Sequence, residues 1–210
     1  MEKNISKSVL ERLPLYLNYL LEIEDEVKNI SATTISKELG LGEVQVRKDL
    51  ALVSDGGRPR TGYITKELIE DISQYLGCNN VIPAVIVGAG KIGRAILGYE
   101  GFTRYGVDIK AAFGHHANKN IELESTKPIL DLSQFGNFCE ANDIEIGIIT
   151  VPAAYAQEIC DLMVSCGIKA IWNFARKTLT VPPGVIVRQE DLAASIAILA
   201  CKLKNKEKEV

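Results

Sequence analysis

Three glycines spaced as G-x-G-x-x-G are the most chemically informative residues of the sequence. The motif is Gly88-Ala89-Gly90-Lys91-Ile92-Gly93, and it directly follows an apolar run that ends at Val87. In such a motif the first glycine permits a tight turn, the second lets a pyrophosphate approach the backbone, and the third lets a helix pack closely on a strand. A glycine-rich turn that binds nothing has the same pattern, but a strand before it and a helix after it favour dinucleotide binding.

The residues at the end of the next predicted strand are those expected to contact the adenosine ribose of a dinucleotide. Dinucleotide-binding folds usually place a carboxylate about 20 residues after the glycines, where it holds the ribose hydroxyls of NAD. This chain has Phe113-Gly114-His115-His116 instead, so this position does not fix a preference for NAD over NADP. Either histidine could face a ribose or a 2′-phosphate, or could be a solvated loop residue. No metal-ligand pattern surrounds these two histidines.

Two further segments follow predicted strands. They are Thr150-Val151-Pro152 and Asn173-Phe174-Ala175. Open α/β folds bind their ligands outside the carboxyl ends of the strands, so we expect both segments to line the cofactor crevice. Ordinary turn chemistry is the alternative, with Pro152 in the first turn of a helix.

A second group of residues has the chemistry of a DNA contact. It consists of Gln45, Arg47, Lys48, Arg58 and Arg60. A glutamine can recognise base edges, and cations can neutralise phosphates. Asp49 and Asp55 are the only acidic residues between Val44 and Tyr63. A solvated helix face beside a charged loop is the alternative.

The elements around these cations predict a winged helix. An apolar stripe at three- and four-residue steps, from Leu10 to Leu21, predicts a helix over residues 7–26. Ser31 is the expected N-cap of a short helix, and a glycine turn at 40–42 leads into a third helix over 43–52. Residues 54–63 are rich in glycine, which excludes a helix and allows a hairpin, the wing. A fourth helix over 65–76 completes a predicted DNA-binding domain spanning residues 1–80.

The rest of the chain has the pattern of a parallel sheet. Continuous apolar runs at 84–87, 109–113, 144–151, 170–172 and 185–187 are typical of strands buried on both faces. Helices over 91–99 and 153–166 would supply the crossovers. We therefore predict an α/β protein in which the winged-helix (helix-turn-helix) domain precedes a Rossmann-like domain over residues 81–188. A last segment, 189–210, contains a helix from Asp191 to Lys204.

Composition limits the class of protein. The chain has 210 residues and a net charge of −3, so DNA binding would depend on a local patch rather than on bulk positive charge. No apolar run approaches the roughly 20 residues that span a membrane, and the charged N-terminus is unlike a signal peptide, so we expect a cytoplasmic protein. Five cysteines without a C-x-x-C pair indicate neither a disulfide framework nor a zinc site.

In order along nearly the whole chain, these residues resemble the Rex family of redox-sensing repressors. The segments concerned are Val46 to Leu50, Gly62-Tyr63, Val87 to Ala95, Tyr99 to Phe102, Thr150 to Ala153, Asn173 to Ala175, Val187-Arg188 and Asp191-Leu192. The resemblance implies a homodimer whose terminal helix is swapped into the partner and lies near its nicotinamide pocket. It also implies binding to palindromic double-stranded operator DNA with NAD present, and release when NADH accumulates.

The resemblance assigns roles to particular residues. It implies that Arg47, Lys48, Arg58 and Arg60 contact DNA, that residues 88–93 bind the pyrophosphate, and that Thr150, Asn173 and Leu192 lie towards the nicotinamide. Two segments depart from the family pattern. Ala51 to Gly57 replaces Ser-Tyr-Phe-Gly-Glu-Phe-Gly, which bears on operator preference, and Gly114 replaces an aspartate, which bears on cofactor choice.

A redox sensor must distinguish the two oxidation states at the nicotinamide ring, because an effector that binds two conformations equally switches nothing. We expect Arg12, Tyr99 and Asp191 to form a polar relay. The alternatives are a surface ion, a packed core aromatic and a helix cap, respectively. Two other function classes stay open, an NAD(P)-dependent oxidoreductase and a CoA- or nucleotide-binding interaction module. No Tyr-x-x-x-Lys pair and no substrate domain support the oxidoreductase.

Overall fold

The computed structural model describes residues 6–114 and 127–206. The chain divides into two compact units: Met1–Asn80 with Arg104–Gly106, and Val81–Thr103 with Val107–Val210. His115 and His116 lie outside the described residues.

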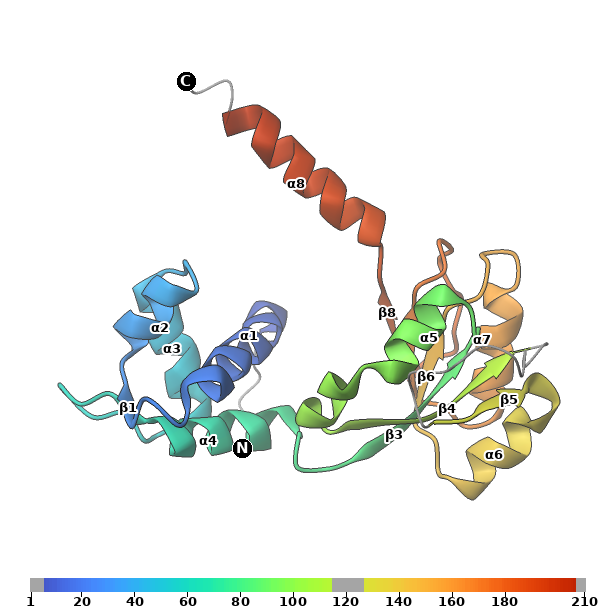
Figure 1. The fold of residues 1–210 in the computed structure, drawn as a ribbon, viewed down its shortest axis with the longest axis horizontal. Coiled ribbons are helices and arrows are strands. Elements are labelled where there is room, and N and C mark those ends of the chain that lie inside the picture. Colours follow the sequence, from blue (N-terminus) through green and yellow to red (C-terminus); the bar gives the residue numbers. More distant parts are fainter. Residues whose placement is uncertain (1–5, 115–126, 207–210) are drawn as a thin grey trace. The chain divides into compact units, whose positions relative to one another are not determined.

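The N-terminal unit is a small helical domain with a two-stranded sheet (Figure 1). Its elements are α1 (Lys7–Ile23), β1 (Asn29–Ile30), α2 (Ala32–Glu38), α3 (Glu43–Val53), β2 (Tyr63–Ile64) and α4 (Thr65–Leu76). The Ser31 hydroxyl caps α2 by accepting a hydrogen bond from the Thr34 backbone N–H at 3.0 Å, as predicted. The first helix ends at Ile23 rather than at Glu26, because the acidic residues that follow are unfavourable at the negative end of a helix dipole.

The core of this unit is formed by one face of α1 together with the other three helices. Leu13, Tyr16, Leu17 and Leu20 of α1 are fully buried. Leu10, which the apolar stripe had included, is 45% exposed. The buried stripe therefore begins at Val9 and continues through Leu13, Leu17 and Leu20, so the predicted first member was wrong by one residue.

The wing is a tight hairpin that begins after α3. Arg58 and Gly62 exchange backbone hydrogen bonds of 2.8 and 2.9 Å. Strand β2, directly after the hairpin, pairs antiparallel with β1, a two-residue strand that the sequence pattern did not predict. Gly62 has a φ of +77°, and a Cβ there would lie 2.2 Å from the Ile30 carbonyl oxygen. A glycine is thus required where the wing meets β1.

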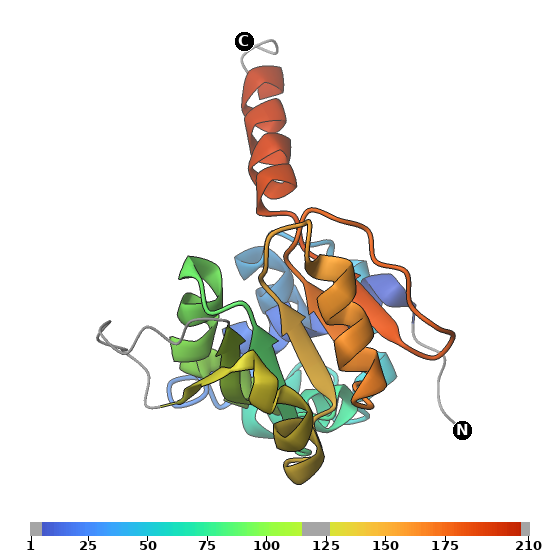
Figure 2. The same ribbon diagram turned by 90° about the vertical axis from the view of Figure 1, so that its right-hand side faces the viewer.

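The C-terminal unit is built on a six-stranded parallel sheet (Figures 1 and 2). The strands are β3 (Ile82–Val87), β4 (Val107–Gly114), β5 (Ile129–Asp131), β6 (Ile146–Ile149), β7 (Ala170–Asn173) and β8 (Ile186–Gln189). Their spatial order is β5-β4-β3-β6-β7-β8. The other elements are α5 (Lys91–Gly98), η1 (Glu100–Tyr105), η2 (Leu132–Gln134), α6 (Phe135–Ala141), α7 (Ala156–Ser165) and α8 (Leu192–Lys206).

Successive residues of the central strand β3 serve two different cores. Val85 and Val87 pack with residues of α6 and α7, whereas Ala84 and Ile86 pack with Leu97 of α5. This two-sided burial explains the unalternating apolar runs. The prediction of a helix-turn-helix domain followed by a Rossmann-like parallel sheet is confirmed.

Helix α8 differs from every other helix of its unit in its exposure. Its large apolar residues are each about 60% exposed: Leu192 63%, Ile196 62%, Ile198 59%, Leu199 60% and Leu203 62%. Single exposed apolar side chains are ordinary, but a continuous set on one helix marks an interaction surface.

Candidate functional site

The glycine motif lies where the strand order of the sheet reverses. β3 ends at Val87, the turn follows, and α5 begins at Lys91. The neighbours of β3 are β4 on one side and β6 on the other. Doubly wound folds hold their ligands outside the carboxyl ends of the strands at this point.

Gly88 and Gly93 are required by the packing of the loop itself. Gly88 has a φ of +116°, and its Cβ would lie 2.6 Å from the Thr150 carbonyl carbon. A Cβ on Gly93 would lie 2.0 Å from the Gly88 carbonyl oxygen. The Thr150 hydroxyl donates to that same oxygen at 2.7 Å, and Arg94 Nε donates to the Ala89 carbonyl at 2.8 Å. The loop is therefore rigid in its own right.

Gly90 differs from the other two glycines because its Cβ would meet nothing within 4 Å. Gly90 is the N-cap residue of α5, and Gly90, Lys91 and Ile92 are all exposed. An open position directly before the first N–H groups of a helix fits a pyrophosphate. The residues present thus fit a dinucleotide, which would be bound by backbone N–H groups of the loop.

The end of β4 lies beside this loop. A Cβ on Gly114 would be 3.4 Å from the Ala89 Cβ, so the structure brings Gly114 to the glycine motif as expected. Phe113 is fully buried and packs edge-on against Phe135 and Phe138, with ring centroids 5.0 and 5.4 Å apart. Phe113 is therefore a core residue. His115 lies outside the described residues.

The segments after β6 and β7 have different roles. Thr150 contacts the glycine loop, and Val151 is half-buried next to the exposed Pro152. Asn173 is fully buried; its Nδ2 donates to the Lys177 carbonyl at 2.8 Å and to Gln189 Oε1 at 2.7 Å. Its Oδ1 accepts from the Ala175 N–H at 2.9 Å. The Asn173 amide thus holds the loop after β7 to β8, a role that residue spacing does not indicate.

An aromatic chain runs from Tyr99, directly after α5, to Phe174, directly after β7. Tyr99, 60% exposed, contacts Phe102 edge-on at 5.0 Å. Phe102 contacts Trp172 at 5.9 Å, and Trp172 contacts Phe174 at 4.5 Å. Tyr99 is the exposed end of this chain and not a packed core aromatic.

Asp191 and Arg12 each have partners in the structure. Asp191 Oδ1 accepts from the backbone N–H groups of Ala193 and Ala194 at 2.9 and 3.1 Å, so Asp191 caps α8. Arg12 lies in the N-terminal unit and forms an ion pair of 2.7 Å with Asp49 of α3. Its side chain is 15% exposed, so Arg12 is not a surface ion.

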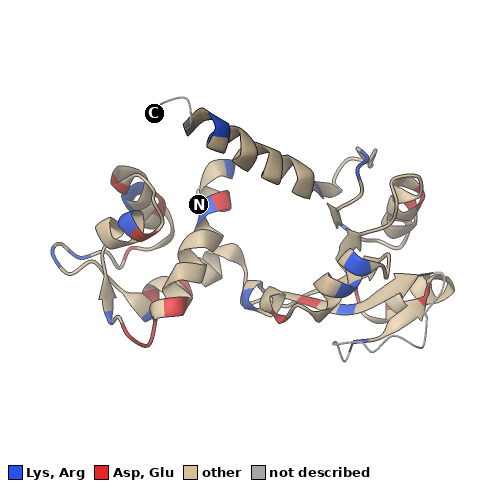
Figure 3. Ribbon diagram, turned by 45° about the horizontal axis from the view of Figure 1, so that its top comes forward, with Lys and Arg blue, Asp and Glu red and all other residues tan. Residues whose placement is uncertain are grey.

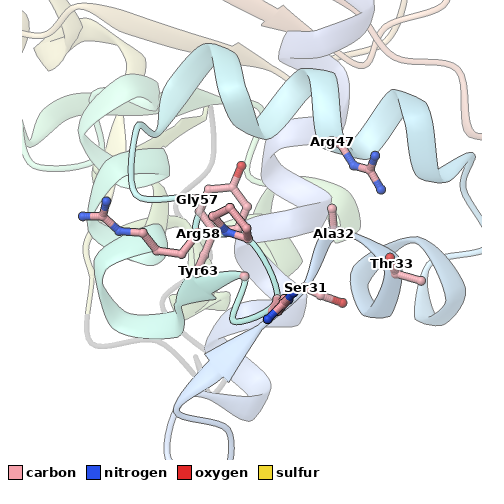
Figure 4. A pocket seen from close by; sticks show the side chains of 10 residues that line it. Ser31, Ala32, Thr33, Arg47, Gly57, Arg58 and Tyr63 are labelled. Atoms are coloured by element: carbon pink, nitrogen blue, oxygen red, sulfur yellow. The ribbon is translucent and has the colours of Figure 1, made fainter.

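Three of the five predicted DNA-contacting residues, Arg47, Arg58 and Arg60, line one hollow of the N-terminal unit (Figure 4). The hollow has a volume of about 540 Å³ and is lined by Ser31, Ala32, Thr33, Arg47, Gly57, Arg58, Pro59, Arg60, Gly62 and Tyr63. Arg47 comes from α3, and Arg58 and Arg60 come from the wing, which forms a basic tip in Figure 3. Gln45 and Lys48 are exposed on α3 outside this lining.

The charge of the hollow is only partly offset within the unit. Arg47 forms an ion pair with Glu43, one turn earlier on α3. Both side chains are well exposed, and pairs of this kind contribute about 0.3–0.5 kcal/mol, so a phosphate can replace Glu43 at little cost. The hollow is therefore suited to an anionic backbone.

In the described part of the chain, neither a metal-ligand cluster nor a membrane-spanning helix is found. No group of three or more His, Cys, Asp or Glu residues there is placed to hold a metal ion. None of the helices described has both the length and the hydropathy that crossing a bilayer requires.

Comparison with known proteins covers both units. A family model described as a putative DNA-binding protein N-terminus matches residues 4–51, and one described as a CoA binding domain matches residues 79–177. The redox-sensing transcriptional repressor Rex of Treponema denticola is 40% identical over 199 residues, covering 94% of this chain and 95% of the relative. Rex of Clostridium botulinum strain Hall is 39% identical, covering 98% and 99%. The chain belongs to the Rex family of redox-sensing transcriptional repressors.

Solved structures agree with the Rex assignment. The crystal structure of RSP in complex with β-NAD⁺ and operator DNA matches with a TM-score of 0.85 at 32% identity, covering 98% of this chain and 95% of that one. The complex of RSP with β-NADH matches equally well, covering 97% of that chain. RSP is a Rex-family repressor. Rex relatives carry the name of transcriptional regulators rather than of enzymes.

Proposed function

We propose that this Rex-family protein binds a palindromic double-stranded operator as a homodimer and leaves it when NADH occupies the site at residues 88–93. The observation that carries the proposal is that one chain combines an open Gly90 at the switch point of a parallel sheet with a basic hollow between α3 and the wing. The match to RSP, solved with NAD⁺ and operator DNA and with NADH, supports it.

The proposal divides the chain by role. Residues 1–80 bind DNA, residues 81–188 bind NAD(H), and residues 189–210 carry the swapped helix. On the DNA, Arg47, Arg58 and Arg60 neutralise phosphates around the hollow, and Gln45 and Lys48 face the major groove from α3. The protein acts in the cytoplasm, in keeping with its five free cysteines.

The cofactor site is proposed around the rigid loop. The backbone from Gly88 to Gly93, including Ala89, Lys91 and Ile92, holds the pyrophosphate at the N-terminus of α5. Gly114 faces the adenosine ribose, with Phe113 packed behind it. Thr150, Val151 and Pro152 border the nicotinamide side. Asn173 positions that side through its buried amide, and Phe174 and a partner's Leu192 complete it.

The swapped helix is proposed because α8 has an apolar surface that its own subunit does not cover. Burying it against a second copy would place Asp191 and Leu192 at the partner's site. Tyr99, exposed at the end of the aromatic chain, would meet Asp191 there. Arg12 would transmit the change to α3 through Asp49.

The switch requires two dimer arrangements that bind NAD⁺ and NADH with different affinity. An effector shifts such an equilibrium only by its differential affinity, and about 10⁴-fold is needed to move it from 1:99 to 99:1. The oxidised ring carries a positive charge that the reduced ring lacks. Only one arrangement would space the two α3 helices for adjacent half-sites.

An electrophoretic mobility shift on a palindromic operator, titrated separately with NADH and NAD⁺, tests the function. We expect NADH to dissociate the protein–operator complex and NAD⁺ to leave it intact. Equal affinity with both cofactors would contradict the proposal. The matched control is Lys66→Ala, an exposed cation on α4, which should retain NADH-dependent release.

The identity of the ligand is tested by calorimetry with NADH, NADPH and CoA. The match of residues 79–177 to a CoA binding domain model makes CoA the specific competitor. We expect NADH to bind most tightly. Preferential binding of CoA would favour an interaction module, and turnover of NADH with a small carbonyl compound would favour an oxidoreductase.

A further inference from the structure

Arg12 connects α1 to α3 through a buried carboxylate. Its Nε and Nη2 donate to Asp49 Oδ2 and Oδ1 at 2.7 and 3.0 Å, and the Tyr16 hydroxyl donates to Oδ2 at 2.7 Å. Asp49 is only 3% exposed. A bidentate pair of this geometry fixes the plane of the guanidinium, so Arg12 is a rigid group at the surface of α3.

The outer edge of the same guanidinium lies against the amide of Gln45. With its Oε1 toward Arg12, Gln45 accepts hydrogen bonds from Nη1 at 2.9 Å and from Nη2 at 3.2 Å. The opposite orientation would place the Gln45 amino group against a guanidinium, which has donors only. Only one orientation of the amide therefore makes hydrogen bonds.

The orientation of Gln45 matters because of its place on α3. Gln45 is the third residue of the helix and is exposed, and the N-terminal residues of a recognition helix contact base edges. Both lone pairs of Oε1 are used by Arg12, so the group left to face DNA is the amino group, with its two N–H donors.

We propose that Arg12 is a positioning residue that makes Gln45 a donor-only contact to the operator. A free glutamine pairs with adenine through both N6 and N7. The fixed amide instead selects a base with a major-groove acceptor, namely guanine N7 or O6, adenine N7 or thymine O4. It gains nothing from the amino groups of adenine or cytosine. This inference rests on the proposed DNA binding and adds the chemistry that selects the sequence.

The test uses the full-length protein with NAD⁺ and a palindromic duplex that the wild type selects from random-sequence DNA. Base analogues remove one major-groove acceptor or one amino group at a time. We expect one half-site position where loss of an acceptor weakens wild-type binding about fivefold, the value of one hydrogen bond, and does not weaken Gln45→Ala further. Loss of an amino group should never show a penalty that depends on Gln45; such a penalty would overturn the inference.

A double variant, Arg12→Met with Asp49→Asn, tests the role of Arg12. Changing both partners avoids leaving an unpaired buried charge. The freed amide should then accept as well as donate, so loss of an amino group at the same position becomes costly. Unchanged preferences in a folded double variant would overturn the positioning role. If the double variant does not fold, the Gln45→Ala comparison still decides the donor-only contact. A wild type that selects no duplex would overturn the proposed function as a whole.

Discussion

The three glycines of the G-x-G-x-x-G motif differ in what a methyl group would meet. At Gly93 it would meet the Gly88 carbonyl oxygen at 2.0 Å, whereas at Gly90 it would meet nothing within 4 Å. The same residue type therefore serves internal packing at one position and leaves room at another. Alanine substitutions at Gly90 and Gly93 should therefore have different effects, the first on ligand binding and the second on stability.

Gly90→Ala is expected to leave the fold unchanged and to weaken NADH binding at least tenfold. Its φ of −79° is accessible to alanine, and the added methyl group would project into the space assigned to the pyrophosphate. Calorimetry with NADH measures the loss, and the thermal midpoint without ligand checks the fold. Wild-type affinity in this variant would refute a pyrophosphate site at Gly90.

Gly93→Ala is the matched contrast. The methyl group would clash with the Gly88 carbonyl oxygen, a backbone atom that cannot move aside as a flexible side chain could. We therefore expect a loss of about 1–3 kcal/mol in the free energy of unfolding, typical of overpacking. Urea unfolding without ligand measures it. Stability equal to that of Gly90→Ala would contradict the close contact with the Gly88 carbonyl.

At the scale of elements, the contact between Tyr16 of α1 and Asp49 of α3 makes the stability of the N-terminal unit depend on pH in the alkaline range. Burial, reinforced by the Asp49 carboxylate, raises the pKa of Tyr16 to about 12. The phenol of the unfolded chain ionises near pH 10, so between those values unfolding releases a proton. The free energy of unfolding should therefore fall with rising pH, by up to about 1.4 kcal/mol per pH unit from this group, and be unaffected by it below about pH 9.

Tyr16→Phe isolates this term. The variant loses a hydrogen bond to Asp49, about 1 kcal/mol at every pH, but its stability should fall less steeply above about pH 10 than that of the wild type. Urea unfolding from about pH 8 to about pH 11 measures both slopes. Parallel curves over the whole range would show that Tyr16 titrates alike in the folded and unfolded chain.

The arginines of the wing should make operator affinity depend on salt concentration. Each phosphate contact contributes close to one unit to the slope of log affinity against log salt concentration. Arg58→Gln removes one cation per subunit from the hollow, so a dimer should lose about two units of slope. Operator titrations at several salt concentrations measure it, with the exposed Lys66→Gln as the charge-matched control. An unchanged slope would remove Arg58 from the interface.

The sequence predicted the elements with long, regular patterns better than it predicted those held by distant partners. The α3 helix and five of the six parallel strands were predicted from their composition and are present, whereas the three-residue strand β5 was not predicted. The β1 strand is two residues long and exists because it pairs with β2, which no local pattern encodes. Helix α6 is seven residues long, too short for a periodic signal.

At the candidate site, sequence position indicated location but not role. Thr150 directly follows β6 and Asn173 is the last residue of β7, so both lie at carboxyl ends of strands, as expected. The Asn173 side chain is nevertheless committed to Lys177, Ala175 and Gln189, and Gln189 lies sixteen residues away in sequence. Arg12 likewise meets Asp49 at a separation of 37 residues. Such pairs depend on how elements pack, so residue spacing could not reveal them.

At the scale of the whole molecule, α8 is an apolar helix without cover. Leu199 and Ile196 are 60% and 62% exposed, whereas a helix of a stable fold normally buries such a face. Burying an exposed leucine or isoleucine gains about 1.5–3 kcal/mol. A second copy of the chain, contributing the same helix in return, doubles that gain, which is the energetic basis of the proposed exchange.

Ile196→Asp with Leu199→Asp should therefore convert the dimer to a monomer. Two carboxylates in an apolar interface would each lose hydration without a partner. Analytical ultracentrifugation measures the mass, and operator affinity should fall with dimerisation, because two half-sites are bound by one symmetric pair. Asn205→Asp, at the polar end of α8, is the control and should remain dimeric. If the doubly substituted protein stayed dimeric, the subunits would have to associate through another surface, and α8 would not reach the partner's cofactor site.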